Sequence, residues 1–251
     1  MTSRIAIFTV LLATTVACNN HTSTNNDHNI MTTVPASPPS VPAGAYQGTI
    51  PCADCPGIIY QLTFLDNNQF QDLTLYQERN NNKAFTDVGS WKLLNDSIII
   101  LERKQPQQLL FKENRLFFLD QTGNRKGGSL NDNYILRPVE GANASIRKDK
   151  AAKGISFTAG GNEPNWSIDL RKGNKITFHT SQLDSLEIPI PPARPNTDSL
   201  KVYTASTKAG NFKLSIRDQA CLDDMSGFMR PIAVELQLGD KTYHGCGEYI
   251  K

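Results

Sequence analysis

A period-two alternation of apolar and polar residues, broken at short intervals by turn residues, constrains the fold of this chain more than any other feature. Between residues 46 and 138 the alternation recurs in short runs that clusters of Asn, Asp and Gly separate. The runs are residues 58–65, 70–76, 85–93, 97–102, 109–112, 116–120 and 134–136. Because no helical period is sustained here, the sequence predicts an antiparallel meander that closes into a barrel or sandwich.

A second series of short β-type runs follows residue 154. It comprises residues 155–159, 166–170, 175–180, 200–205, 212–217, 232–238 and 242–246. Residues 140–154 hold small residues and a basic cluster, which we interpret as a solvated linker. The proline-dense residues 187–195 are expected to form a surface loop. The sequence therefore predicts an all-β protein of two small antiparallel domains, residues 44–139 and 155–251, the second a small barrel or sandwich.

The first residues have the pattern of an export signal rather than of a folded domain. Arg4 precedes an apolar run that is too short to span a bilayer, and small residues then lead to Cys18. We interpret residues 1–17 as a lipoprotein signal peptide and Cys18 as the lipidated N-terminus, with an ordinary secretory cleavage as the alternative. Residues 18–43, which are rich in Asn, Thr, Ser and Pro, predict a disordered tether. Asn19 resembles the outer-membrane sorting pattern, so we expect a lipid-anchored outer-membrane protein that faces the periplasm.

Charge and motifs exclude several classes of function. The formal net charge of +2 is too close to neutral to suggest a nucleic-acid partner. The sequence has no nucleophile elbow, no His-Glu-x-x-His motif and no phosphate-binding glycine loop. We therefore expect a protein that is not an enzyme.

The cysteines carry most of the chemistry that the sequence offers. Five are present, and setting Cys18 aside for the lipid leaves an even number in a compartment that permits disulfides. Cys52 and Cys55 are close enough to form a disulfide, to act as a regulatory thiol pair, or to bind a soft cation such as Cu(I). A thioredoxin-like role is not indicated, because no helix follows the pair. Cys221 and Cys246 are interpreted as a disulfide between a loop and the last strand, either a structural staple or a redox sensor.

A metal site at Cys52 and Cys55 would need further ligands or a linear geometry with two thiolates. Copper is the cofactor that these two residues suggest, and it is not firmly indicated. The additional ligands that the sequence offers are Met31, Met225, Met229 and His244. Methionines near the end of a domain more often serve in packing. Asp223 and Asp224 could bind a hard cation, but two adjacent carboxylates are a weak signal and we favour a solvated turn.

The residues around the first cysteine pair resemble a known family. They are Gly44-x-Tyr46-x-Gly48, then Pro51-Cys52-Ala53-Asp54-Cys55-Pro56-Gly57-Ile58, followed by Tyr76, Gly89-x-Trp91 and Tyr134-x-Leu136. This order is similar to the N-terminal domain of the NlpE family of outer-membrane lipoproteins. The resemblance implies a lipocalin-like barrel and a role in envelope-stress sensing or copper homeostasis. It also implies partners: the outer membrane through the lipid anchor, and an envelope signalling protein.

The second half resembles a different, uncharacterised family of bacterial envelope β-domains. That family has a Gly-Asn-Glu-Pro-Phe-Trp signature near its start, and a Cys-x-Asp-x-Met-Ser segment that leads to a Gly-Cys end. Here the corresponding residues are Gly161-Asn162-Glu163-Pro164-Asn165-Trp166, Cys221-Leu222-Asp223-Asp224-Met225-Ser226 and Gly245-Cys246. The family provides no chemistry to transfer. The alternative function for the whole chain is a carrier that holds a small apolar ligand or lipid inside the first barrel.

Overall fold

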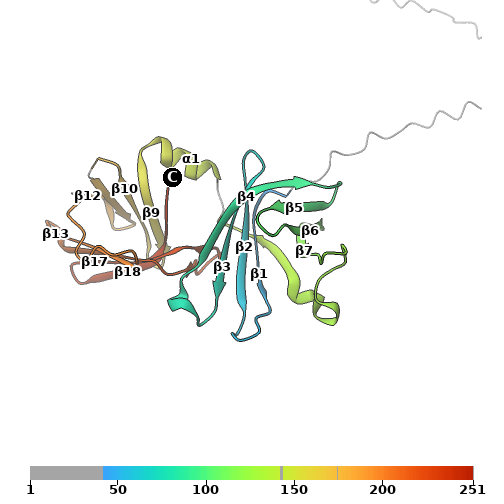
Figure 1. Cartoon of the computed structure of the whole chain (residues 1–251). Helices are drawn as coiled ribbons and strands as arrows, with labels where there is room; N and C mark the ends of the chain where they lie inside the picture. Colours follow the sequence, from blue (N-terminus) through green and yellow to red (C-terminus); the bar gives the residue numbers. More distant parts are fainter. Residues whose placement is uncertain (1–41, 142–143, 174, 251) are drawn as a thin grey trace, which may run out of the picture. The chain divides into compact units, whose positions relative to one another are not determined.

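The first part of the chain forms a closed antiparallel barrel in the computed structural model, which describes residues 42–141, 144–173 and 175–250 (Figure 1). Its strands are β1 (Gly44–Ile50), β2 (Ile58–Leu65), β3 (Gln69–Tyr76), β4 (Phe85–Leu93), β5 (Ile98–Glu102), β6 (Gln107–Lys112), β7 (Arg115–Phe118) and β8 (Ile135–Val139). Two short 3-10 turns, η1 (Asn80–Asn82) and η2 (Gly128–Tyr134), connect strands. Each strand pairs with the next, and β1 pairs with both β2 and β8, which closes the barrel.

Turn chemistry explains where the meander reverses direction. The turn between β2 and β3 contains Asn67 and Asn68 with φ of 58° and 55°, and Asn114 between β6 and β7 has φ of 55°. Asparagine tolerates this left-handed conformation better than most residues, and such turns match the twist of antiparallel strands. The asparagine clusters in the sequence therefore mark true hairpin turns.

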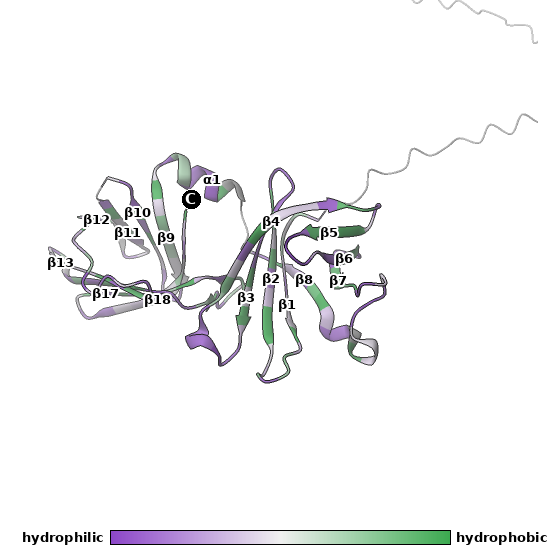
Figure 2. Cartoon of the chain, viewed as in Figure 1, coloured by the Kyte–Doolittle hydropathy of each residue, from purple (hydrophilic) through white to green (hydrophobic). Residues whose placement is uncertain are grey.

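Apolar side chains fill the interior of the barrel. The alternation along β2 directs Tyr60, Leu62 and Phe64 inward, and Leu62 is fully buried. Aliphatic and aromatic residues from the other strands pack against them: Tyr46, Phe70, Trp91, Ile99, Leu101, Leu109, Phe111, Leu116, Phe118 and Leu136. Hydrophilic residues gather at the loops in Figure 2, while the strands carry the hydrophobic positions. A filled core of this kind is what an eight-stranded barrel can enclose.

The second part of the chain forms an eight-stranded antiparallel sheet and a small two-stranded one. The larger sheet has the order β12-β11-β10-β9-β18-β17-β14-β13. Its strands are β9 (Ile155–Asn162), β10 (Asn165–Arg171), β11 (Lys175–Thr180), β12 (Leu183–Pro189), β13 (Leu200–Thr207), β14 (Gly210–Arg217), β17 (Ile232–Leu238) and β18 (Lys241–Tyr249). The smaller sheet pairs β15 (Cys221–Leu222) with β16 (Met229–Arg230). The all-β prediction is confirmed, and both β parts belong to one compact unit.

Two segments differ from the sequence-based expectations. The stretch expected to be a solvated linker forms a helix, α1 (Ala144–Ala152), and Arg147 on this helix contacts Gln71 and Glu248. The proline-dense segment begins inside strand β12, where Ile188 is buried. β12 is an edge strand, and Pro189 is its last residue, so the missing N–H is tolerated. Among the described residues no helix is long and apolar enough to cross a membrane.

Candidate functional site

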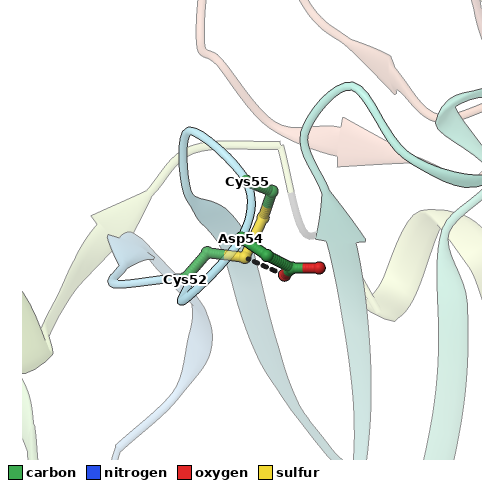
Figure 3. Close-up of side chains that lie close together, drawn as sticks. All are labelled: Cys52, Asp54 and Cys55. Atoms are coloured by element: carbon green, nitrogen blue, oxygen red, sulfur yellow. Dashed lines mark hydrogen bonds between the residues drawn. A yellow bond between two sulfur atoms is a disulfide. The ribbon is translucent and has the colours of Figure 1, made fainter.

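The Cys-x-x-Cys loop connects β1 to β2 at one end of the barrel (Figure 3). The Cα atoms of Cys52 and Cys55 are 5.3 Å apart and their sulfur atoms are bonded. A Cβ atom at Gly57 would lie 2.7 Å from the side chain of Thr49, so the loop needs glycine where it returns to β2. The loop is thus a tight, surface-exposed turn that the disulfide closes.

An exposed carboxylate lies beside this disulfide. Asp54 Oδ1 is 3.5 Å from Cys52 Sγ, and the side chain of Arg79 lies 3.1 Å from the Asp54 carboxylate. Cys52, Asp54 and Cys55 form the group of potential metal ligands that the described part of the chain brings together. While the disulfide is closed neither sulfur can act as a thiolate ligand, so only the reduced loop offers a soft metal site.

The other ligands suggested by the sequence do not lie in this loop. Met225 is 79% exposed, whereas Met229 is completely buried against barrel residues. His244 is an exposed residue of β18. Met31 and Cys18, the predicted lipidation residue, lie outside the described residues. Met229 is therefore a packing residue, and the structure explains why it is a methionine rather than a polar residue.

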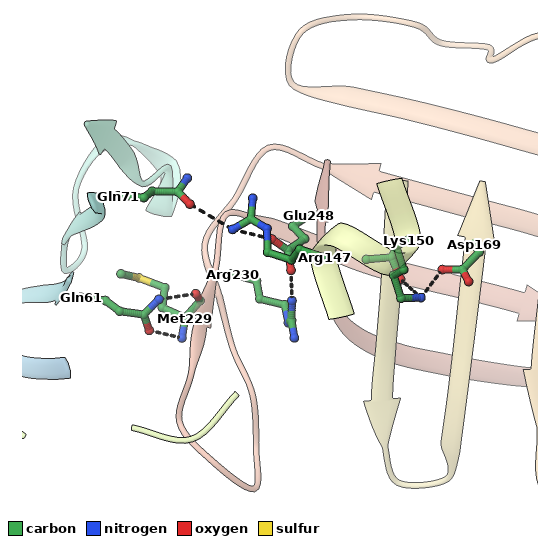
Figure 4. Close-up of polar contacts among 9 residues, drawn as sticks. Gln61, Gln71, Arg147, Lys150, Asp169, Met229, Arg230 and Glu248 are labelled. Carbon is green, nitrogen blue, oxygen red and sulfur yellow. Dashed lines mark hydrogen bonds and ion pairs between the residues drawn. The ribbon is translucent and has the colours of Figure 1, made fainter. Parts of the chain in front are cut away.

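A segment of the second part, residues 218–230, contacts the outer face of the barrel, and we call it the docking segment. The side chain of Gln61 accepts a hydrogen bond from the Met229 backbone N–H at 2.8 Å and donates one to the Met229 carbonyl at 2.9 Å (Figure 4). The Met229 side chain packs on Ile59, Leu73 and Leu75 of β2 and β3. This contact buries outward-facing residues that would lie in solvent on an isolated barrel.

Further polar contacts fix the same segment. Asp218 pairs with Lys83 at 2.5 Å, and the Ala220 N–H donates to the Asn82 carbonyl at 2.7 Å. The Gln47 side chain donates to the Gly227 carbonyl at 3.1 Å. The docking segment therefore contacts the barrel along most of its length. Sequence reasoning missed this interface, and the signal that could have indicated it is the outward-facing apolar pair Leu73 and Leu75.

The second disulfide fastens the docking segment to the large sheet. Cys221 lies in the docking segment and Cys246 in β18, and their Cα atoms are 5.3 Å apart. Cys246 is buried, whereas Cys221 is partly exposed. The bond joins the segment that contacts the barrel to the strand at the centre of the second sheet.

The two signatures of the second half meet in space. Asn162 donates to Asp223 at 3.2 Å, which links the first signature to the second. Asp223 also accepts bonds from the N–H of Met225 and from the N–H and hydroxyl of Ser226. Partial burial alone would raise the pKa of Asp223, but the bonds from Ser226 and Asn162 outweigh it and lower the pKa. The Asp223 turn is thus held by its own hydrogen bonds, which explains this aspartate without a cation.

Glycines make room for the indole of Trp166. Trp166 is buried, and its Nε1 donates to the His244 carbonyl at 3.0 Å. A Cβ atom at Gly161 would lie 2.2 Å from the His244 carbonyl oxygen, and one at Gly245 would lie 2.1 Å from the Gly160 carbonyl oxygen. β9 and β18 therefore approach each other around this ring only because both positions are glycine.

We expect Gly245→Ala to lower the free energy of unfolding by about 1–3 kcal/mol, the usual cost of inserting a methyl group into a packed region. The methyl group would meet backbone atoms, which cannot move aside as a flexible side chain can. Urea unfolding measures the change, with Lys213→Ala on the exposed side of β14 as the control. Equal stability of the two variants would show that β9 and β18 can separate without cost.

A buried polar network occupies the barrel below the cysteine loop. The Tyr60 hydroxyl donates to Asp72 at 2.5 Å, and Arg103 donates to Asp72 at 2.7 Å and to the Tyr60 oxygen at 2.9 Å. Burial and the neighbouring Asp72 raise the pKa of Tyr60, so the phenol stays protonated. Tyr60 and Arg103 also line an opening of about 320 Å³ at this end of the barrel. The network gives the barrel one charged feature in an otherwise apolar interior.

Comparison with known proteins identifies the first domain. Residues 46–129 match the model of the NlpE N-terminal domain. The barrel is similar to the N-terminal domain of the NlpE family. No curated protein matches the chain. The family resemblance of the first half is thereby confirmed, whereas that of the second half stays a prediction.

Two solved structures are similar to the chain. One is a "putative lipoprotein" from Shewanella oneidensis, with 35% identity and a TM-score of 0.35 over 38% of this chain and 87% of that one. The other is the Cpx pathway activator NlpE from Escherichia coli, with 16% identity and a TM-score of 0.32 over 82% of this chain and 94% of that one. Neither TM-score is high enough to establish a shared overall arrangement, so the resemblance to the NlpE family rests on the match of residues 46–129.

Proposed function

We propose that this chain is a non-enzymatic lipoprotein, anchored to the outer membrane through Cys18 and facing the periplasm, that acts in envelope-stress sensing or copper homeostasis. The observation that carries the proposal is the match of residues 46–129 to the NlpE N-terminal domain. Two disulfides support the proposal, because a disulfide can respond to the redox state of the envelope. The Cys52–Cys55 bond lies in a surface loop, and the Cys221–Cys246 bond holds the docking segment.

The Cys221–Cys246 bond offers a physical route from the redox state of the envelope to the barrel. The docking segment is tied to β18 by this bond and to the barrel by Gln61 and Lys83. Reduction removes the covalent tie to β18 and leaves non-covalent contacts to hold the segment: those with the barrel, the Asn162–Asp223 hydrogen bond and the Arg230–Glu248 ion pair. An envelope signalling protein that recognises the barrel face under the docking segment would then gain access to it.

Deleting the gene tests the cellular role. We expect the deletion strain to lose copper tolerance or to lose induction of an envelope-stress reporter after copper or surface adhesion. The wild-type gene should restore the response, and Cys18→Ala should fail to restore it because the protein is no longer held at the membrane. Unchanged tolerance together with an unchanged stress response would overturn the proposal.

A role in copper homeostasis makes a separate prediction about the Cys52–Cys55 loop. We expect the reduced protein to bind Cu(I) at Cys52 and Cys55, because two thiolates suit a soft cation, and the oxidised protein not to bind it. Titration with Cu(I) before and after reduction measures this. Cys52→Ser/Cys55→Ser should abolish the uptake, while Cys221→Ser/Cys246→Ser is the matched control and should keep it. Absence of uptake by the reduced protein would leave stress sensing as the remaining role.

The alternative of a carrier that uses the barrel interior has no specific support. Thirteen buried side chains pack together there, among them Leu62, Ile99 and Leu109, which have no exposed surface. The opening at the barrel end is lined partly by charged groups, Arg103 and Lys126. An apolar ligand inside this barrel would have to displace core residues.

A further inference from the structure

A cavity of about 640 Å³ has walls from both the barrel and the second part of the chain. The barrel contributes the end of β2 and Trp91 of β4 to its wall. The second part contributes α1, the start of β10, the docking segment and the end of β18. The volume is typical of a site for a small molecule. Several residues of both signatures line it, including Asn162, Trp166, Asp223 and Cys246.

Aromatic rings form much of the apolar wall. Phe64, Trp91, Trp166 and Phe228 line the cavity, and the rings of Phe64 and Trp91 meet edge to face at 5.3 Å. The chain contains two tryptophans, and both of them border this cavity. Such walls favour an apolar body in the ligand.

One buried donor at the cavity lacks an acceptor. Trp91 is only 7% exposed, and its Nε1 has no hydrogen-bond partner among the described residues. Trp166, by contrast, donates to the His244 carbonyl. An unsatisfied buried N–H is unfavourable, so an acceptor oxygen supplied from the cavity would be stabilising.

Two arginines and one glutamate lie together at the wall of the cavity. Arg147 lies 3.3 Å from Glu248, and Arg230 pairs with the same carboxylate, so two guanidinium groups share one negative charge (Figure 4). Among the other charged groups of the wall, Lys150 pairs with Asp169 and Asp66 with Lys148. Asp223 keeps its negative charge, because its partners Asn162 and Ser226 are neutral. The Arg147–Glu248–Arg230 group itself carries an excess positive charge, and guanidinium groups bind carboxylate and phosphate oxygens well.

We propose that this cavity binds a small amphiphile with an apolar body and an anionic oxygen head, a carboxylate or a phosphate. The apolar body contacts the aromatic wall, and the head lies near Arg147 and Arg230. The inference is independent of the stress-sensing or copper role, because it rests on this cavity alone.

Tryptophan quenching tests the location of the ligand. The probe is decanoate brominated on its chain, used below its micelle concentration with the full chain carrying Cys18→Ala. In Trp91→Phe only Trp166 emits, and we expect saturable quenching, because Trp166 borders the cavity but belongs to the second sheet. Quenching of the wild type without quenching of Trp91→Phe would place the ligand against the barrel alone and overturn the proposal. Absence of saturable quenching in both proteins would also overturn it.

A second experiment tests the recognition of the head. We expect decanoate and decyl phosphate to bind at least about tenfold more tightly than uncharged decanol, a difference of about 1.4 kcal/mol. Arg230→Met should remove most of this preference, and Arg125→Met, on the Phe117 ring away from the cavity, is the matched control. Equal affinity of the wild type for decanol and decanoate would overturn the proposal that the cavity recognises an anionic head. Native mass spectrometry of protein taken directly from cells distinguishes the sources, since a bound fatty acid and a bound phospholipid differ in mass.

Discussion

Replacing Arg103 with leucine is expected to lower the free energy of unfolding by about 3–5 kcal/mol at neutral pH, the usual cost of breaking a buried ion pair by removing one partner. Asp72 is only 2% exposed and lies among the side chains of the barrel interior. In the wild type it accepts hydrogen bonds from Tyr60 and Arg103. The leucine variant keeps the Tyr60 bond but leaves the Asp72 charge without a cation inside the barrel.

The loss of stability in Arg103→Leu should increase as the pH rises. Burial is the main cause that raises the pKa of Asp72 above its ordinary value of 3.8, and the bonds from Tyr60 and Arg103 oppose it. Without Arg103 the pKa rises further, so the folded variant binds a proton that the unfolded chain releases. The variant is therefore closest to the wild type at and below pH 3.8, and it loses stability as the pH rises through the raised pKa of Asp72.

Comparison of chemical unfolding at several pH values measures this effect as the difference between variant and wild type. Adding Asp72→Asn to Arg103→Leu should remove the pH trend, because no buried carboxyl group remains. Lys92→Leu breaks an exposed pair with Glu102 and should cost less than about 1 kcal/mol. A pH-independent loss in Arg103→Leu would show that packing, and not the Asp72 charge, sets the cost.

The strands were largely predictable from the sequence because the alternation reports directly on which residues face a core. The predicted runs 58–65, 175–180 and 232–238 have the same bounds as β2, β11 and β17. β12 was missed because prolines near residue 189 suggested a loop, and only the pairing with β11 shows that the strand ends there. The basic residues of α1 suggested solvent exposure, but Arg147 reaches Gln71 and Glu248.

The candidate sites were predictable only where they are local in the sequence. The spacing of Cys52 and Cys55 limits how far apart they can be, so their proximity follows from the sequence. The cavity is different, because Trp91, Arg147, Trp166 and Arg230 come from distant elements and no periodicity relates them. Gln61 shows the same limit: its alternation directs it outward, and only the docking segment makes it 1% exposed.

Removing the second disulfide is expected to have the other large effect. The bond closes a sequence separation of 25 residues. In the chain-entropy model such a bond contributes about 3 kcal/mol, so Cys221→Ser/Cys246→Ser should lower the free energy of unfolding by about that amount. Cys52→Ser/Cys55→Ser is the matched control with a separation of 3 residues, and its loss should be clearly smaller.

The loss should also be unevenly distributed over the molecule. Without the bond, the docking segment is held by non-covalent contacts alone. These include its own turn, its barrel contacts at Gln61, Asn82 and Lys83, and its contacts with Asn162 of β9 and Glu248 of β18. We expect hydrogen exchange in residues 218–230 to accelerate more than exchange in the barrel strands β5 and β6, because the segment can then open by breaking non-covalent contacts alone. Uniform acceleration across the chain would mean that the bond stabilises the fold as a whole and does not control the docking segment. In that case the Cys221–Cys246 pair would be a structural staple, and redox control of the barrel face would have to be abandoned.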